Sequence, residues 1–268
     1  AYLVANSGRD VRRERLADLF WSESEPVRAR GALNTVVWRI NKILAGIEGL
    51  ALRSGADLLT LETCPEAQVD AKALETTVRD AAGAGLADES DSLPAQTRAA
   101  LARAVDDYHG PFLEGSSSEW AEMERERLAP LLIRGLGLLM RDSAQRRDYE
   151  EALGYGRRIL AADPFREQVQ CEMMWLYVLN GQRPQALRHF ESYRRMIAHE
   201  INVGPMAETR ALVEYIRDER DEPVEPSAFR GLARASDPLA LLRATAEKSR
   251  LNAYRTFSAA APRPELFG

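Results

Sequence analysis

The chain has 268 residues, of which 45% are hydrophobic and 29% are charged, and its formal net charge is −5 at pH 7. This composition is that of a soluble folded protein and excludes a disordered one, and the acidic balance excludes a strongly basic nucleic-acid-binding module. No apolar run approaches the roughly 18 residues that a membrane-spanning helix needs, so we expect a cytoplasmic location and no membrane partner. The length predicts two domains.

The sequence contains no pattern typical of catalysis or metal binding. Cys64 and Cys171 are the only cysteines, and neither has a Cys or His at ligand spacing, which predicts inert thiols. No glycine-rich phosphate-binding loop is present. The histidines lack a partnering Ser, Cys or acidic pair; they are His109, His189 and His199. We therefore expect no enzymatic activity, no catalytic residue, no cofactor and no metal.

Two short helical segments are expected at the start of the chain. The segment AYLVAN is apolar and periodic from its first residue, so we expect further residues before Ala1. The turn signal SGR follows, and VRRERLADLFW then repeats apolar residues at helical spacing. These residues are Val11, Leu16, Leu19 and Phe20. Ser22 or Ser24 is expected to cap the next helix.

A third helix is predicted from Pro26 to Leu44, because proline suits the first turn of a helix and an apolar stripe follows at i, i+3, i+4 and i+7 spacing. The stripe consists of Leu33, Val36, Val37, Ile40, Ile43 and Leu44. The opposite face consists of Arg28, Gly31, Asn34, Thr35, Trp38, Arg39 and Lys42. It is polar except for the tryptophan, and such a face also occurs on any solvated helix.

The runs LALR and LLTLE, on either side of the turn from Ser54 to Asp57, predict a β-hairpin. Three helices and a hairpin predict a winged helix-turn-helix, in which the third helix lies in the major groove of DNA. The hairpin tip, Arg53 to Asp57, would be the wing. Charge gives little further support, because residues 1–65 hold nine basic and eight acidic side chains, a net charge of +1.

From Val69 onward the patterns are helical. The expected helices cover VDAKALETTVRDAAGAG, PAQTRAALARAVDDY and SEWAEMERERLAPLLIRGLGLLMRDSAQ. A repeat follows, because RDYEEALGYGRRILAADP aligns with GQRPQALRHFESYRRMIAHE at an offset of 34 residues, which is the tetratricopeptide period. Residues that fit this consensus are Pro164, Tyr177, Gly181, Ala186 and Phe190. Trp175 and Tyr177 are predicted to pack between helices.

After Arg217 the segment DERDEPVEPSAF mixes charge with proline and predicts a linker. The next segment, SDPLALLRATAEKSRLNAYRTF, regains helical spacing and predicts an amphipathic helix. Three roles stay open for this helix: docking on the helical domain, docking on a dimer mate, and connection to a further domain. The predicted domains are therefore a winged helix over 1–63, a tetratricopeptide-like domain over 64–220, and a linker with a helix over 221–268.

These segments resemble one family, the SARP regulators of antibiotic pathways, which join an OmpR-type winged helix to a bacterial transcriptional activator domain. The resemblance covers most of residues 1–220. The segments that support it are SGRDVRRERLADLFW, RARGAL, YHGPFLEG, SEWAEMERERL, DYEEALGYGRRILAADPFRE and ALRHFESYRRMIAHEINVGPMAETRAL. The implied fold is mainly α, a winged helix-turn-helix followed by an all-α tetratricopeptide-like domain. Family members begin with a small sheet and most of a first helix that this sequence lacks, so the winged helix is expected to be N-terminally incomplete.

The resemblance implies a transcriptional activator, associated with the nucleoid, that binds promoter repeats in double-stranded DNA as a homodimer and contacts RNA polymerase. Carried onto this chain, the helix from Pro26 to Leu44 is the recognition helix. The implied DNA-binding residues are Arg28, Arg30, Asn34, Thr35, Trp38, Arg39, Lys42 and Arg53.

The sequence departs from the family on the outer face of this helix, at Asn34, Trp38 and Asn41. Two roles are open to Trp38: contact with a thymine methyl or a sugar, or packing against the wing, the helical domain or a partner protein. The alternative function is accordingly a protein-interaction scaffold whose winged helix no longer binds DNA. A third alternative is an unidentified effector bound on the concave face of the helical repeats.

Overall fold

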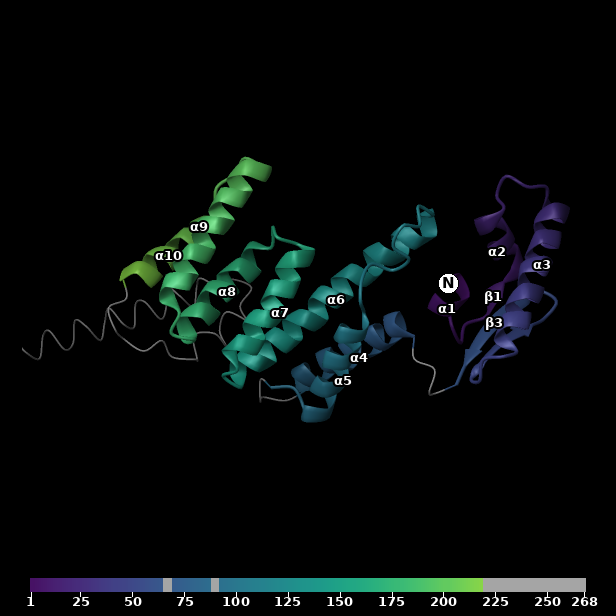
Figure 1. The fold of residues 1–268 in the computed structure, drawn as a ribbon, viewed down its shortest axis with the longest axis horizontal. Coiled ribbons are helices and arrows are strands. Elements are labelled where there is room, and N and C mark those ends of the chain that lie inside the picture. The colour runs from purple at the N-terminus through teal and green to yellow at the C-terminus, as the bar shows by residue number, and fades with distance from the viewer. Residues whose placement is uncertain (65–68, 88–91, 219–268) are drawn as a thin grey trace, which may run out of the picture. The chain divides into compact units, whose positions relative to one another are not determined.

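A computed structural model describes residues 1–64, 69–87 and 92–218 (Figure 1). These residues form two compact units, one of residues 1–79 with 100–132 and the other of residues 80–99 with those from 133 onward. The linker and amphipathic helix expected over 221–268 lie outside the described residues. The domain boundaries expected at residues 63 and 220 stay predictions.

The N-terminal part of the first unit contains the elements of a winged helix (Figure 1). In chain order they are α1 (Tyr2–Ala5), β1 (Val11–Arg12), α2 (Arg13–Phe20), α3 (Pro26–Leu44), β2 (Leu50–Ser54) and β3 (Leu58–Thr63). The strands form an antiparallel sheet of order β1-β3-β2, in which Leu52 pairs with Leu61. The predicted third helix and hairpin are confirmed.

Strand β1 corrects the expectation that Val11 belongs to a helix. Val11 pairs with Leu59 of β3, its side chain is buried in the core, and α2 starts only at Arg13. A β-branched residue at this point packs well on a sheet. A two-residue strand has no alternation that a sequence pattern can reveal, so only the tertiary pairing identifies it.

Helix α3 begins at Pro26 as predicted, but neither Ser22 nor Ser24 caps it. The capping residue is Glu25, which makes no side-chain capping bond and whose carbonyl oxygen accepts a hydrogen bond from the backbone nitrogen of Ala29 at 2.9 Å. The backbone nitrogen of Ser24 instead donates to the carbonyl of Trp21, at the end of α2. Proline at the first position has no amide hydrogen that needs a cap.

The apolar stripe of α3 packs on α2 and the sheet. Leu33 and Val37 are buried together with Leu16, Leu52 and Leu59. Ile43 does not join them, because it is 67% exposed. At about 100° per residue it lies some 80° from Leu33, at the edge of the stripe, so including it in the core was wrong.

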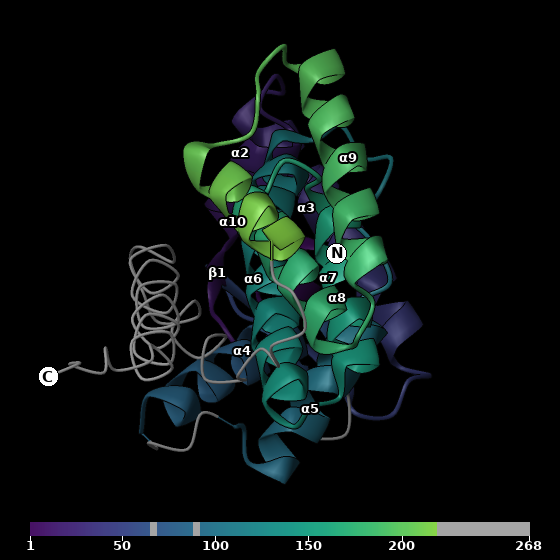
Figure 2. The same cartoon turned by 90° about the vertical axis from the view of Figure 1, so that its left-hand side faces the viewer.

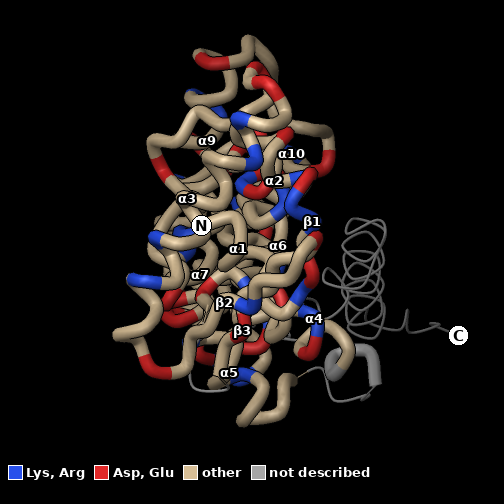
Figure 3. Tube along the Cα trace, turned by 90° about the vertical axis from the view of Figure 1, so that its right-hand side faces the viewer, with Lys and Arg blue, Asp and Glu red and all other residues tan. Residues whose placement is uncertain are grey.

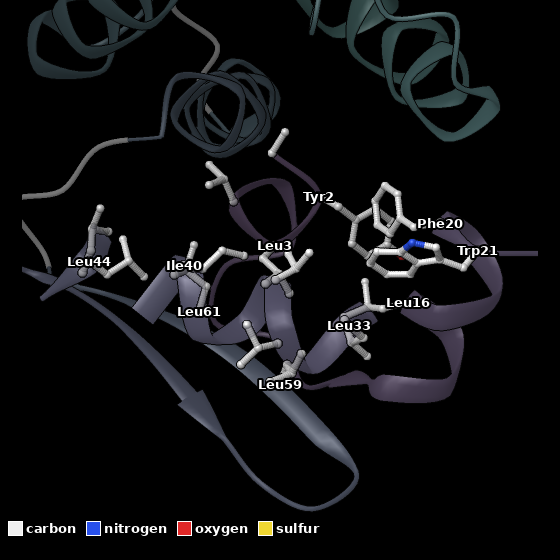
Figure 4. Close-up of a pocket in the computed structure, with 15 residues that line it drawn as sticks. Tyr2, Leu3, Leu16, Phe20, Trp21, Leu33, Ile40, Leu44, Leu59 and Leu61 are labelled. Atoms are coloured by element: carbon white, nitrogen blue, oxygen red, sulfur yellow. The ribbon is translucent and has the colours of Figure 1, made fainter. Parts of the chain in front are cut away.

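An apolar cleft of about 500 Å³ opens in the winged helix between α1, α2, α3 and the sheet (Figure 4). Tyr2 and Leu3 of α1, Phe20 of α2, and Leu33 and Ile40 of α3 line it. The described residues therefore leave one side of this core open.

Helices make up the regular structure that follows Thr63, and no strand occurs there among the described residues. They are α4 (Asp70–Ala87), α5 (Ala95–Asp107), α6 (Glu119–Gln145), α7 (Tyr149–Ala162), α8 (Glu167–Leu179), α9 (Arg183–Glu200) and α10 (Ala207–Asp218). Within the first unit, the ring of Trp120 in α6 lies edge-on to Tyr2 at 5.3 Å and to Phe20 at 6.0 Å. These aromatic contacts pack the start of α6 against the winged helix.

In the second unit, α7 and α9 are the two copies of the predicted repeat, and α8 packs against both (Figure 2). Ala152 of α7 and Ala186 of α9 are fully buried, as small residues that let helices approach closely should be. Trp175 and Tyr177 of α8 are buried, which confirms their packing roles. The predicted fold, winged-helix elements followed by an all-α tetratricopeptide-like part, is confirmed.

Candidate nucleic-acid interface

The buried stripe determines which side of α3 faces outward. At about 100° per residue, five of the predicted contact residues lie opposite Leu33 and Val37. Asn34 lies on the flank, and Arg30 lies at the edge of the buried stripe, near the start of the helix. The five are Arg28, Thr35, Trp38, Arg39 and Lys42. All seven side chains belong to exposed residues, as does Arg53 of β2. The predicted site therefore comprises an outward face, one residue on the flank, one at the edge of the stripe and one residue of the wing.

The outward face carries cations without a carboxylate partner. Arg28, Arg39 and Lys42 form no ion pair with any described residue. The hydroxyl of Thr35 donates to the carbonyl of Gly31 one turn earlier, so it serves the helix itself. An exposed cation with no internal partner is available to an anion from another molecule.

Trp38 is not packed against the wing. Trp38 is 62% exposed, and the Lys42 ammonium lies 5.4 Å from the centroid of its ring. This cation–π contact holds the ring and the charge together on the surface. Of the roles open to Trp38, packing against the wing is excluded, and contact with DNA, with the helical domain or with a partner protein stays open.

Outside the outward face, two of the predicted cations are already paired. Arg30 lies 3.9 Å from Glu14 of α2. Arg53 lies 3.8 Å from Asp10 and 3.3 Å from Glu62. All of these side chains are more than half exposed, and such surface pairs contribute little and weaken as salt rises. A phosphate can therefore replace these carboxylates at little cost.

Arg13 adjoins the candidate site and was not predicted from the sequence. It lies at the start of α2 and donates hydrogen bonds to Asn34 of α3 and to Ser54 and Gly55 at the hairpin turn. Arg13, Asn34 and Gly55 line a polar cleft of about 870 Å³ between α2, α3 and the wing. The run of basic residues in VRRER was the available signal, but helical spacing alone gave no reason to separate Arg13 from its neighbours.

The charge distribution is mixed rather than strongly basic. Basic and acidic residues alternate along the trace (Figure 3), in line with the net charge of +1 over residues 1–65. Affinity for a polyanion would therefore come from a few placed cations rather than from the overall field.

Neither a metal centre nor a membrane span occurs in the part of the chain that the structure describes. No group of three or more His, Cys, Asp or Glu residues there could hold a metal ion. No described helix is long and apolar enough to cross a membrane. Both cysteines are free. Burial raises the pKa of the Cys171 thiol to about 11, which lowers its reactivity.

Comparison with known protein families gives a match to the bacterial transcriptional activator domain over residues 69–217, which is more than half of the chain. The chain belongs to this family. It is a family of transcription regulators rather than a class of enzymes, and the resemblance to SARP-type regulators noted in the sequence is confirmed.

Two relatives are similar along most of this chain. Regulatory protein AfsR of Streptomyces coelicolor is 27% identical over 217 residues, which are 81% of this chain and 21% of that protein. Regulatory protein AfsR of Streptomyces griseus is 25% identical over 230 residues, which are 84% of this chain and 22% of that protein. The chain thus spans about a fifth of the length of these relatives.

A solved structure also matches the fold. Mycobacterium tuberculosis EmbR in complex with a low affinity phosphopeptide aligns with a TM-score of 0.60 and 21% identity, over 86% of this chain and 61% of that one. At this identity the match shows a shared fold. It agrees with a winged helix followed by a helical activator domain.

Proposed function

We propose that the chain binds double-stranded DNA through the outward face of α3 and thereby activates transcription. The observation that supports this most strongly is the set of three exposed cations that form no ion pair with a described residue, Arg28, Arg39 and Lys42, on the face of α3 opposite its buried stripe. Phosphate contacts from such side chains position a recognition helix in the major groove, and they supply most of its affinity.

The other predicted residues have distinct roles in this proposal. Arg30 and Arg53 exchange their exposed carboxylate partners for phosphates, so the wing follows the backbone beside the groove. Trp38 contacts a thymine methyl or a sugar, because apolar groups recognise that methyl. Thr35 contributes through its methyl group, because its hydroxyl already donates to Gly31.

The partners beyond DNA follow from the family to which the chain belongs. We propose that the chain binds repeated promoter sites as a homodimer and contacts RNA polymerase through its helical part. Transcription takes place on the chromosome, so the protein would act at the nucleoid in the cytoplasm.

The test is selection of a random duplex pool by the whole chain, repeated at two salt concentrations. We expect enrichment of a directly repeated motif. Combining Arg39→Glu with Lys42→Glu should abolish binding at moderate salt. At low salt, any residual binding should have a salt slope smaller by about two, since each lost phosphate contact removes roughly 0.9 from it.

The matched control reverses two cations on the helical repeats, Arg157→Glu with Arg195→Glu, and changes the net charge by the same amount. It should bind like the wild type if the contact lies on α3. Equal loss in both variants would mean that net charge alone matters. Unchanged binding after reversal at Arg39 and Lys42 would contradict the site.

A second candidate function is supported by the exposure of Trp38, which is 62%. An exposed tryptophan is a common anchor in protein interfaces, so the winged helix would then bind a protein instead of DNA. Under this alternative no motif is enriched from the pool. Trp38→Ala would then weaken a protein complex, whereas under the first proposal it weakens DNA binding.

A further inference from the structure

Arg13 connects the wing to α3 through three hydrogen bonds. Its Nη1 donates to Asn34 Oδ1 at 2.8 Å, its Nη2 to Ser54 Oγ at 2.7 Å, and its Nε to the Gly55 carbonyl at 3.0 Å. Its backbone nitrogen also donates to the carbonyl of Asp57 at 2.9 Å. One side chain therefore holds the hairpin turn and the flank of α3 at a fixed separation.

This contact determines which way the amide of Asn34 points. A guanidinium donates hydrogen bonds and accepts none, so the atom that faces Arg13 is the amide oxygen. An asparagine without such a partner can turn its amide by 180° and exchange oxygen and nitrogen. Asn34 is exposed, and its Nδ2 donates to no other described residue. The NH₂ group is therefore the polar group that Asn34 offers to another molecule.

The cleft around this contact suits an anionic chain. Arg12, Arg13 and Arg30 line it, against the carboxylates Glu14 and Asp57. Glu14 is engaged with Arg30 and not with Arg13. The contact between Arg13 and Asn34 thus lies where the start of α2, the wing and α3 meet, and a DNA strand held by α3 and the wing would pass there.

We propose that Arg13 is a positioning residue that holds Asn34 as a donor-only contact to DNA. This inference rests on the proposed binding of DNA through α3. An amide that contacts DNA through its NH₂ group pairs with the keto oxygen of guanine or thymine, with N7 of either purine, or with a phosphate oxygen. A contact to N7 alone does not distinguish guanine from adenine. The paired contact by which asparagine recognises adenine also uses the amide oxygen, for which Arg13 competes, so this contact is disfavoured.

The first test replaces the NH₂ donor of Asn34 and keeps an oxygen atom that accepts from Arg13. In Asn34→Asp, one carboxylate oxygen still accepts from Arg13, and the other presents an acceptor to DNA. Selection of a random duplex pool by the whole chain should then change one motif position from guanine, thymine or either purine to cytosine or adenine, whose amino groups donate. If the acceptor is a phosphate, affinity should fall roughly tenfold for every sequence, with the motif unchanged.

These two outcomes identify the source of the acceptor atom, and both support the proposal. Asn34→Ala shows which motif position Asn34 contacts, since only that position should lose its base preference. A wild-type preference for adenine over guanine at that position would overturn the proposal, because it requires the amide oxygen as well as the NH₂ group. Wild-type affinity and motif after Asn34→Asp would overturn it as well.

The second test releases the amide. Arg13→Met removes all three side-chain hydrogen bonds of Arg13, so the Asn34 amide can turn. We expect the motif to admit adenine at the affected position, or the affinity for DNA to fall by roughly fivefold. Arg15→Met, at an exposed position of α2 that does not line the cleft, is the control for the lost charge. Ser54→Ala is the control for the wing, because it removes one hydrogen bond of Arg13 and retains the contact with Asn34. Both controls should keep the wild-type motif.

Retention of the wild-type motif and affinity by Arg13→Met would overturn the proposal. If that variant does not fold, as thermal unfolding would reveal, the exposed substitution Asn34→Asp decides alone. A wild-type chain that enriches no motif rejects the proposed function and this inference together. A wild-type chain that enriches a motif, while none of these substitutions alters either the motif or the affinity, rejects only this inference.

Discussion

Helices α3 and α8 each contain a tryptophan, and they place it in opposite surroundings. Trp38 of α3 is 62% exposed, with a lysine ammonium over its ring, whereas Trp175 of α8 is 1% exposed and lies 5.7 Å from the ring of Tyr215. Six consecutive residues of α8, from 172 to 177, are buried, while α3 buries one stripe. A helix buried all round serves packing, and a helix buried on one stripe keeps a face for another molecule.

The two tryptophans should therefore respond differently to truncation. Trp175→Ala removes a large buried side chain, and we expect the free energy of unfolding to fall by about 3–5 kcal/mol. Trp38→Ala should change it by less than about 0.5 kcal/mol, because surface substitutions rarely do more. Denaturant unfolding of both variants measures this difference. A loss above 2 kcal/mol for Trp38→Ala would mean that Trp38 packs within the protein and is not a contact for another molecule.

The sequence predicted those parts of the fold whose signals are local. Pro26 at the start and the stripe around Leu33 gave α3 its bounds, and the two apolar runs around Ser54 gave the hairpin. Strand β1 was missed, because Val11 joins the sheet through Leu59, which lies 48 residues further along the chain. The sequence also did not reveal that α3 lacks a serine cap. This depends on the turn after α2, where the backbone nitrogen of Ser24 donates to the carbonyl of Trp21.

The candidate site was predictable only in part, for a similar reason. The helical spacing of the apolar stripe predicted that the side chains opposite the core include Trp38, Arg39 and Lys42. It could not reveal that Asn34 is engaged by Arg13, a residue 21 positions earlier. Residue type suggests what a side chain can bind, whereas the tertiary structure determines which of its atoms are already in use.

The close packing around α8 can be tested from the neighbouring helix with two glycines of α7. A Cβ at Gly156 would come within 2.2 Å of Met173 Sδ, whereas a Cβ at Gly154 would meet nothing within 4 Å. Met173 is buried and has little room to move. We expect Gly156→Ala to lower the free energy of unfolding by about 1–3 kcal/mol through overpacking.

Gly154→Ala is the matched control, because both glycines lie within the same helix. A Cβ at Gly154 meets no neighbour, so only the higher helix propensity of alanine over glycine acts there. Gly154→Ala should therefore raise the free energy of unfolding by roughly 0.5–1 kcal/mol. Thermal unfolding of the two variants separates packing from helix propensity. Equal effects would contradict the close approach of α7 and α8 at Gly156.

The smallest expected effect concerns the one acidic side chain that α8 buries. Burial raises the pKa of Glu172, while the charge of Arg141 and a hydrogen bond from Gln168 at 3.1 Å lower it, and burial has the larger effect. A carboxyl group whose pKa is raised on folding destabilises the folded state when it is charged. This cost shrinks as the pH falls through the folded pKa and is gone below the unfolded pKa. Glu172→Gln should therefore raise the unfolding temperature at pH 7.

The gain from Glu172→Gln should shrink as the pH is lowered, because the wild-type carboxyl then takes up a proton in the folded state before it does so in the unfolded state. Glu126→Gln, at an exposed position of α6, is the control and should show no such trend. A destabilised Glu172→Gln variant at pH 7 would mean that the attraction to Arg141 outweighs burial. Helix α8 would then depend on a buried charge pair as well as on apolar packing, and its contrast with the charged surface of α3 would be smaller.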